Sequence, residues 1–233
     1  MALFTIGDLH LSFGVNKPMD IFKGWNNYQD RLAENWQKKI KPDDTVVLPG
    51  DFSWAINLTE AIPDFNFVEN LNGKKILLKG NHDYWWETKT KMDRFFEDNG
   101  FESFSILNNN HYKYGDIGIC GTRGWINENG VAADKKVLSR EAGRLEMSIQ
   151  SALNENLKPV VFLHYPPIYA NDKNYEILEV IEKYNIKKCF YGHIHGSAVN
   201  YAIDGIVDDI LYRLVSSDYL EFDPLDITDI IID

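Results

Sequence analysis

The chain has 233 residues, of which 44% are hydrophobic, and a formal net charge of −11 from 24 basic and 35 acidic residues. This length allows one sizeable core, and because no linker-like stretch divides it, we expect a single domain over residues 1–233. The negative charge disfavours binding to long nucleic acid. It does not exclude a small phosphorylated substrate, because bound metal ions can invert the local field.

The sequence has features typical of a cytoplasmic protein. Its N-terminus carries neither a basic segment nor a long apolar one, and no apolar run approaches the ~20 residues of a membrane span. Cys120 and Cys189 both lie in apolar runs, which predicts buried, unpaired thiols and fits a reducing cytosol. We therefore expect no membrane contact, and the sequence favours no particular oligomeric state.

Five short apolar runs end abruptly in polar residues that can bind metal ions. Each run is continuous and partly β-branched, which suits a strand buried on both faces. The runs are Ala2–Ile6 before Asp8 and His10, Thr45–Leu48 before Asp51, Lys75–Leu78 before Asn81 and His82, Val160–Leu163 before His164, and Cys189–Tyr191 before His193 and His195.

Helical patterns lie between several of these runs. Apolar residues at three- and four-residue spacing predict a helix over Trp25–Ile40. Pro63 should interrupt a helix, so the stretch around it is ambiguous. Strands that alternate with helices imply a largely parallel sheet. The same spacing predicts helices over Lys89–Glu97, Leu138–Leu153 and Tyr175–Tyr184.

Later stretches indicate a second sheet. Tyr112–Tyr114 and Ile117–Cys120 flank Gly115-Asp116, which predicts a hairpin. Beyond His195, Ala198–Ile203 and Ile210–Val215 are strand-like, and no clear helix accompanies them. We therefore expect two sheets packed together with helices outside. Ligand sites of α/β sheets collect beyond the carboxyl ends of the strands, where the polar clusters would meet.

Five of the six histidines directly follow the apolar runs, and only His111 stands apart. Histidine is the commonest metal ligand, and a mixed set with Asp and Asn suits Mn, Fe or Zn better than Ca. Each motif alone is weak, because Asp8-Leu9-His10 is more often a turn and Asp83 suits a helix cap. Likewise, His164 before two prolines is compatible with a core histidine.

The order of the motifs is more specific than any one of them. Asp-x-His at Asp8, Gly-Asp at Asp51, Gly-Asn-His-Asp at Asn81, a strand-end His164 and Gly-His-x-His at His193 follow one another. In this order they resemble the calcineurin-like metallophosphoesterase superfamily. The resemblance implies an α/β (α+β) fold, a four-layer αββα sandwich flanked by helices, with the metal site at the carboxyl ends of the strands.

The resemblance also implies two metal ions, which would be Mn, Fe or Zn, with Mn favoured for activity. Two neighbouring cations neutralise developing charge on a phosphate and lower the pKa of a bound water, so the hydroxide between them is the nucleophile. One ion would be held by Asp8, His10 and His195, the other by Asn81, His164 and His193, and Asp51 would bridge them. His82 would assist the leaving group, with Asp83 orienting its ring.

Residues on the substrate side are less defined. Arg123 lies between glycines, and its guanidinium could grip phosphate bidentately, although a solvated surface turn is equally compatible. Asn81 is a second candidate for substrate contact. The aromatic residues Trp54, Tyr84, Trp85 and Trp86 either stack on a base or sugar or pack beneath the metal loops.

These observations favour a phosphohydrolase that acts on a nucleotide or similar small substrate, with monoesters and diesters both open. Asp51 lacks the following Asp-Arg-Gly run of protein Ser/Thr phosphatases, and 233 residues leave no room for the capping regions of DNA-repair nucleases. A non-catalytic protein-binding scaffold is the alternative, but such proteins usually lose ligands or the catalytic histidine. The His-x-His-x-Asp-His block of metallo-β-lactamases is absent.

Overall fold

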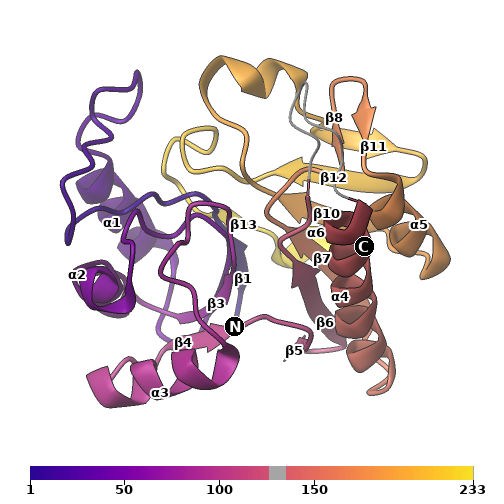
Figure 1. Cartoon of the computed structure of the whole chain (residues 1–233), viewed down its shortest axis with the longest axis horizontal. Helices are drawn as coiled ribbons and strands as arrows, with labels where there is room; N and C mark the ends of the chain where they lie inside the picture. Colours follow the sequence, from indigo (N-terminus) through magenta and orange to yellow (C-terminus); the bar gives the residue numbers. More distant parts are fainter. Residues whose placement is uncertain (126–134, 233) are drawn as a thin grey trace.

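The apolar runs form two main sheets in this computed structural model, which describes residues 1–125 and 135–232 (Figure 1). In the first sheet the order is β13 (Leu225–Asp226), β1 (Leu3–Thr5), β2 (Thr45–Pro49), β3 (Lys74–Leu78) and β4 (Phe104–Ile106). In the second it is β11 (Gly205–Val207), β12 (Ile210–Leu214), β10 (Lys188–Tyr191), β7 (Lys158–Leu163), β6 (Ile117–Thr122) and β5 (Tyr112–Tyr114).

The central strands of both sheets are parallel. β1 to β4 run in one direction, as do β6, β7, β10 and β12, whereas β13, β11 and β5 add antiparallel edges. The predicted hairpin is confirmed, since Tyr114 pairs with Ile117 across the turn. Because parallel strands end on the same side, the residues that follow them gather at one edge.

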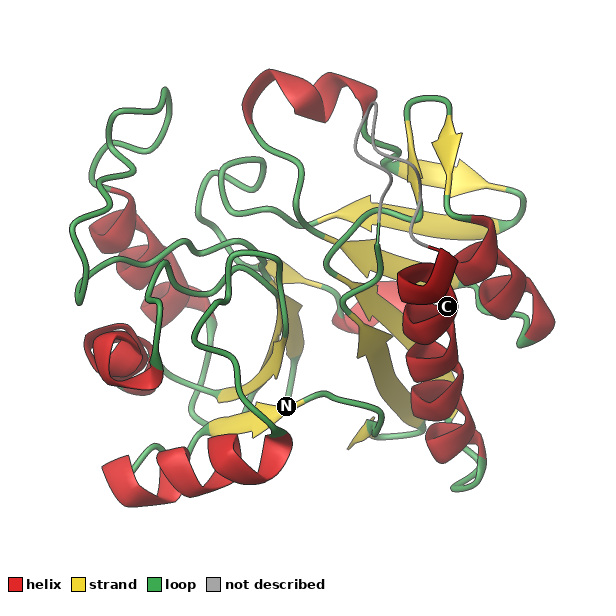
Figure 2. Cartoon of the chain, viewed as in Figure 1, coloured by secondary structure: helices red, strands yellow, loops and turns green. Residues whose placement is uncertain are grey.

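Helices cover the outer face of each sheet (Figure 2). α1 (Tyr28–Lys39), α2 (Leu58–Glu69) and α3 (Lys89–Asn99) lie outside the first sheet, and α4 (Lys135–Leu153) and α5 (Tyr175–Lys183) lie outside the second (Figure 1). Smaller elements are the hairpin of β8 (Ile168–Tyr169) and β9 (Asp172–Lys173), the 3₁₀-helix η1 (Gly196–Tyr201) and α6 (Thr228–Ile232). No helix of the described residues is long and apolar enough to cross a bilayer.

Alternating side chains bury both faces of each sheet. In β2, Val46 and Leu48 join the core beneath α1, α2 and α3, whereas Val47 joins the core between the sheets. In β7, Val161 packs toward α4 and α5, whereas Phe162 faces the first sheet. This period of two produces the expected four-layer αββα sandwich. Cys120 and Cys189 are buried and unpaired, as predicted.

The structure resolves one ambiguity of the sequence and contradicts one expectation. α2 continues through Pro63, because Asn57 caps its start by accepting the Glu60 N–H at 3.1 Å and because Phe65 and Val68 are fully buried. Burial thus outweighs the hydrogen bond that proline cannot donate. The strand expected over Ala198–Ile203 is wrong, because Gly196–Tyr201 forms η1 and has no buried residue to pack in a sheet.

Candidate metal centre

The predicted ligands all lie at the carboxyl ends of central strands. In the first sheet they follow β1, β2 and β3, and in the second they follow β7 and β10. The two sheets therefore supply ligands from both sides of one cluster. The residues are Asp8 and His10 after β1, Asp51 after β2, Asn81 after β3, His164 after β7, and His193 and His195 after β10.

Sharp backbone turns aim these side chains toward each other. Asp8, His10, Asp51 and His193 have positive φ angles of 58°, 47°, 51° and 73°. Non-glycine residues seldom adopt this left-handed region, and those that do cluster at functional sites. The turns are held by hydrogen bonds, since Asp8 N–H donates to Gly50 O and His10 N–H donates to Asp51 O, each at 2.9 Å.

Asp8, His10 and His195 form the first group that can hold a metal ion. Their donor atoms lie within 4.8 Å of one another. The Nε2 atoms of His10 and His195 are 3.4 Å apart, and His195 Nε2 is 3.5 Å from Asp8 Oδ1. Three donors that converge in this way from two sheets fit a divalent cation.

Asp51, His164 and His193 form the second group, again within 4.8 Å of one another. Asn81 adds an amide oxygen, because its Oδ1 lies 2.6 Å from His164 Nε2. Asp51 also reaches the first group, since its Oδ2 is 3.7 Å from His10 Nε2 while its Oδ1 is 3.6 Å from His164 Nε2. The two carboxylate oxygens thus face different groups, and this arrangement suits a bridging ligand.

Burial keeps several of the imidazoles neutral. It lowers the pKa of His193 to about 3, and repulsion between the protonated forms of His193 and His164 acts in the same direction. It also holds the pKa values of His10 and His164 below the usual value of 6.5. A neutral imidazole offers the lone pair that a metal ion needs. Burial and the neighbouring Asp8 raise the pKa of Asp51 to about 8, and a nearby cation would favour its charged form.

Outer partners fix the rings of two histidines. His164 Nδ1 lies 3.1 Å from Pro49 O, and His195 Nδ1 lies 2.7 Å from Asp218 Oδ1. Burial opposes protonation of His195, but hydrogen bonds and charges from Asp218 and Asp8 raise its pKa to about 10. In both residues the Nδ1 contact turns Nε2 toward the cluster, the arrangement typical of metal-bound histidine.

Asp218 was missed by the sequence prediction, although a signal was present. It follows the run Ile210–Val215 in the same way that the other polar clusters follow their strands. That run contains β12, which pairs in parallel with β10 and therefore ends at the same edge. Asp218 also accepts the Gly196 N–H at 2.9 Å, so it fixes the loop after His195 as well as the ring.

His82 lies at the rim of the cluster. Its N–H donates to Asp51 Oδ1 at 2.8 Å, its ring packs against Trp54 at 4.4 Å, and the His10 ring is 5.7 Å away. Burial lowers its pKa to about 4, and repulsion between the protonated forms of His82 and His164 acts in the same direction. It is thus held beside both groups without belonging to either, as a residue that contacts the substrate would be.

Asp83 does not orient the His82 ring, contrary to expectation. Its Oδ2 accepts the Asp51 N–H at 2.9 Å and the Gly80 N–H at 2.7 Å, while its Oδ1 accepts the N–H groups of Phe52 at 2.9 Å and Ser53 at 3.3 Å. The carboxylate is fully buried and joins the loops after β2 and β3. The hydroxyl of Tyr84 is instead the group near His82 Nδ1, at 3.5 Å.

The remaining aromatic and basic residues that we considered for substrate contact do not all lie at the metal cluster. Trp85 is buried against Phe52 and serves as scaffold, whereas Trp54 stacks on His10 with ring centroids 4.8 Å apart. Arg123 is not in the metal cluster, because its guanidinium lies 3.9 Å from Glu141. Its backbone oxygen nevertheless accepts the His164 N–H at 3.1 Å, so it borders the site.

The family model for calcineurin-like phosphoesterases matches residues 1–197 of the chain. The chain belongs to this family. Calcineurin-like phosphoesterases are metal-dependent hydrolases of phosphoesters and typically use two divalent metal ions. The resemblance inferred from the order of motifs is thereby confirmed, and so is the fold class. Among curated proteins, none matches the sequence.

Solved structures show the same fold at low identity. A protein of unknown function, AQ665 from Aquifex aeolicus, has a TM-score of 0.51 and 18% identity, over 99% of this chain and 98% of that one. The phosphopantetheinyl hydrolase PptH from Mycobacterium tuberculosis has a TM-score of 0.50 and 14% identity, over 92% and 88%. TT1561 of Thermus thermophilus has a TM-score of 0.53 and 10% identity, over 83% and 81%.

Proposed function

We propose that this calcineurin-like phosphoesterase hydrolyses small phosphate mono- or diesters at a dinuclear metal centre, with nucleotides or similar molecules as substrates. The ions are Mn, Fe or Zn, and Mn supports activity best. One ion would be held by Asp8, His10 and His195 and the other by Asn81, His164 and His193, and Asp51 is placed where it would serve both.

The orientation of Asp51 is the observation that carries this proposal. Its two oxygens face His10 on one side and His164 on the other, at 3.7 and 3.6 Å. A carboxylate that only capped a turn would have no reason to lie between two sets of imidazoles. Carboxylate, imidazole and amide donors together form the mixed set that Mn, Fe and Zn accept.

When bound, two such cations supply an activated water and neutralise charge that develops on the phosphate. The protein residues position the substrate around them. Asn81 has an NH₂ group without a hydrogen-bond partner among the described residues, and we assign it to a phosphate oxygen. His82 is assigned to the leaving-group oxygen, where its ring N–H stabilises or protonates that oxygen.

The test is an assay of the purified protein with Mn²⁺ on bis(p-nitrophenyl) phosphate and p-nitrophenyl phosphate, with metal content measured by mass spectrometry. We expect turnover of at least one ester, which a chelator abolishes. Asp51→Asn should reduce this turnover by orders of magnitude, because the amide cannot supply two anionic oxygens. His111→Ala is the matched control, because His111 contacts Ser151 outside the cluster and its loss should leave both metal content and rate unchanged.

Two results would contradict the proposal. One is a folded protein that retains no metal and turns over neither ester with any added divalent ion. The other is an Asp51→Asn variant with wild-type turnover, which would remove Asp51 from the bridging role.

A further inference from the structure

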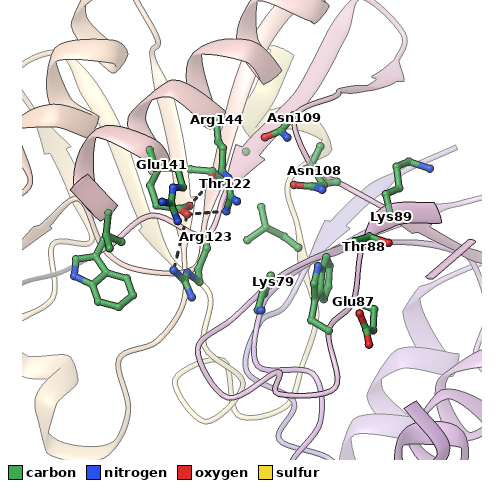
Figure 3. A pocket seen from close by; sticks show the side chains of 17 residues that line it. Lys79, Glu87, Thr88, Lys89, Asn108, Asn109, Thr122, Arg123, Glu141 and Arg144 are labelled. Carbon is green, nitrogen blue, oxygen red and sulfur yellow. Dashed lines mark hydrogen bonds and ion pairs between the residues drawn. The ribbon is translucent and has the colours of Figure 1, made fainter. Parts of the chain in front are cut away.

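The structure also contains a cavity of about 630 Å³, whose lining side chains are drawn in Figure 3. Its walls come from the end of β3, the segment that leads into α3, the segment after β4, the end of β6 and the N-terminal half of α4. None of the seven proposed metal ligands lines it. A volume in this range is typical of sites for small molecules.

The lining of this cavity is basic, although the chain as a whole carries a net charge of −11. Basic side chains outnumber carboxylates among the described lining residues. Such a local excess of positive charge in an acidic protein attracts anions specifically to this place. The basic lining residues are Lys79, Lys89, Arg123, Arg140 and Arg144, and the acidic ones are Glu87 and Glu141. Lys89 pairs with Asp93 and Glu87 pairs with Lys91, so the excess of positive charge comes from Lys79 and the three arginines.

Glu141 holds two of the guanidinium groups in place. Its carboxylate is buried and accepts the Thr122 hydroxyl at 2.7 Å and Arg144 Nη1 at 2.9 Å, while Arg123 Nη2 lies 3.9 Å away (Figure 3). One carboxylate shared between two guanidinium groups leaves positive charge uncompensated. Among the described residues, it also leaves N–H donors of both groups without a partner, and these suit the planar, bidentate contacts that arginine makes with phosphate.

Lys79 adds a third positive charge to the same space. Its half-buried ammonium forms no ion pair or hydrogen bond with any described residue. Cations that gather without enough carboxylates stabilise the protein poorly but suit an anionic ligand.

The cavity and the metal cluster are neighbours along the chain. Lys79 precedes Asn81 by two residues in the loop after β3, and the Arg123 carbonyl oxygen accepts the N–H of His164. We propose that this cavity binds a second phosphate group of the substrate, so that the preferred substrates are small molecules carrying two phosphates. This assignment rests on the proposed phosphoesterase function, in which the first phosphate lies at the metal centre.

The test compares binding of adenosine 3′,5′-bisphosphate and adenosine 5′-monophosphate to the protein as purified, by isothermal titration calorimetry. The two probes differ by one phosphate. We expect wild type to bind the bisphosphate at least about tenfold more tightly, the value of one charge-assisted contact. Lys79→Gln should reduce this advantage to about threefold or less, and Arg140→Gln should weaken it in the same direction. Neither change deprives Glu141 of its partners.

Lys113→Gln is the matched control, because it makes the same change of net charge at an exposed position on β5 outside the cavity. This variant should keep the wild-type ratio of affinities for the bisphosphate and the monophosphate. Equal affinity of wild type for both nucleotides would overturn the proposal, and so would a Lys79→Gln variant that keeps the wild-type ratio.

The outcome is separable from that of the proposed function. The protein could bind the bisphosphate more tightly than the monophosphate, lose this difference on Lys79→Gln, and yet show no metal-dependent turnover. This result would support the anion site and refute hydrolysis. Turnover of the chromogenic esters without such an advantage would support hydrolysis and refute the second phosphate.

Discussion

His82 is the residue whose role is most sharply separable from metal binding. It touches the cluster through its backbone N–H and packs its ring on Trp54. We therefore predict that His82→Ala keeps its metal ions and loses rate, by about 10²-fold or more for a poor leaving group. The rate of hydrolysis should fall more for phenyl phosphate than for p-nitrophenyl phosphate, because phenolate is the poorer leaving group and needs more stabilisation by His82. Loss of metal in this variant would make His82 a ligand.

Position 192 requires glycine because any larger side chain would collide with Asp8. A Cβ atom at this position would lie 2.3 Å from Asp8 Oδ2 and 3.2 Å from Asp8 Cγ. We predict that Gly192→Ala displaces Asp8 and lowers Mn²⁺-dependent turnover by roughly 10²-fold, the cost of an error of about 1 Å in a site. Metal analysis together with kinetics measures this effect.

Gly143 supplies the control for that change. It lies within α4, and a Cβ atom there meets no atom of another described residue within 4 Å beyond the backbone of its own helix. Gly143→Ala should leave metal content and rate unchanged and should raise stability slightly, because alanine is the better helix former. Equal effects of the two alanine substitutions would mean that close approach to Asp8 is not the reason for Gly192.

At the scale of elements, Asp64 links α2 to the loop after β1. Its carboxylate accepts the Phe13 N–H at 2.7 Å and the Ser53 hydroxyl, and burial raises its pKa from 3.8 to about 6. The folded state therefore binds more protons than the unfolded state between these values, so this group makes the free energy of unfolding fall as pH rises from about 4 to about 6.

We predict that Asp64→Asn removes this part of the pH dependence, roughly 3 kcal/mol at most, because an amide does not titrate in this range. Urea unfolding at pH 4.5 and 6.5 measures the difference. The exposed Asp43→Asn changes charge equally and should retain the wild-type slope. A wild-type slope in Asp64→Asn would show that its carboxyl group ionises as easily in the folded state as in the unfolded one.

The regular elements were largely predictable from the sequence, because period-two and helical spacing report local burial. The strands before Asp8, Asp51 and His164 lie where the apolar runs predicted them. The path of the chain through Pro63 was not predictable, since it depends on burial against other elements. The same limit explains Asp83, because only the fold shows that the loops after β2 and β3 meet at its carboxylate.

At the scale of the whole molecule, the residues of the candidate metal centre come from both sheets. Asp8 and Asp51 extend from the first sheet, and His164 and His195 extend from the second. Bound ions would therefore cross-link the sandwich. We predict that a chelator lowers the melting temperature by roughly 5–10 °C, since an ion at 100 times its Kd adds about 2.7 kcal/mol. Differential scanning calorimetry of chelated and Mn²⁺-loaded protein tests this.

The same experiment on Gly192→Ala provides the comparison. Its melting temperature should respond much less to Mn²⁺, because Asp8 is displaced. A wild-type melting temperature that is identical with and without ions would mean that the cluster does not bind metal in the folded state or that the ions do not tie the sheets together.

The pairing of β1 with β13 has a consequence for how the protein is made. Phe4 pairs with Asp226, and His10 meets His195 across 185 residues of sequence. Ribosomes add about 5–20 residues per second, and contacts this distant form late in folding. During synthesis, Asp8 and His10 are therefore made many seconds before His195 is added to the chain. We therefore expect any metal to be loaded only after synthesis of the chain, when the ions available in the cell at that moment compete for the site.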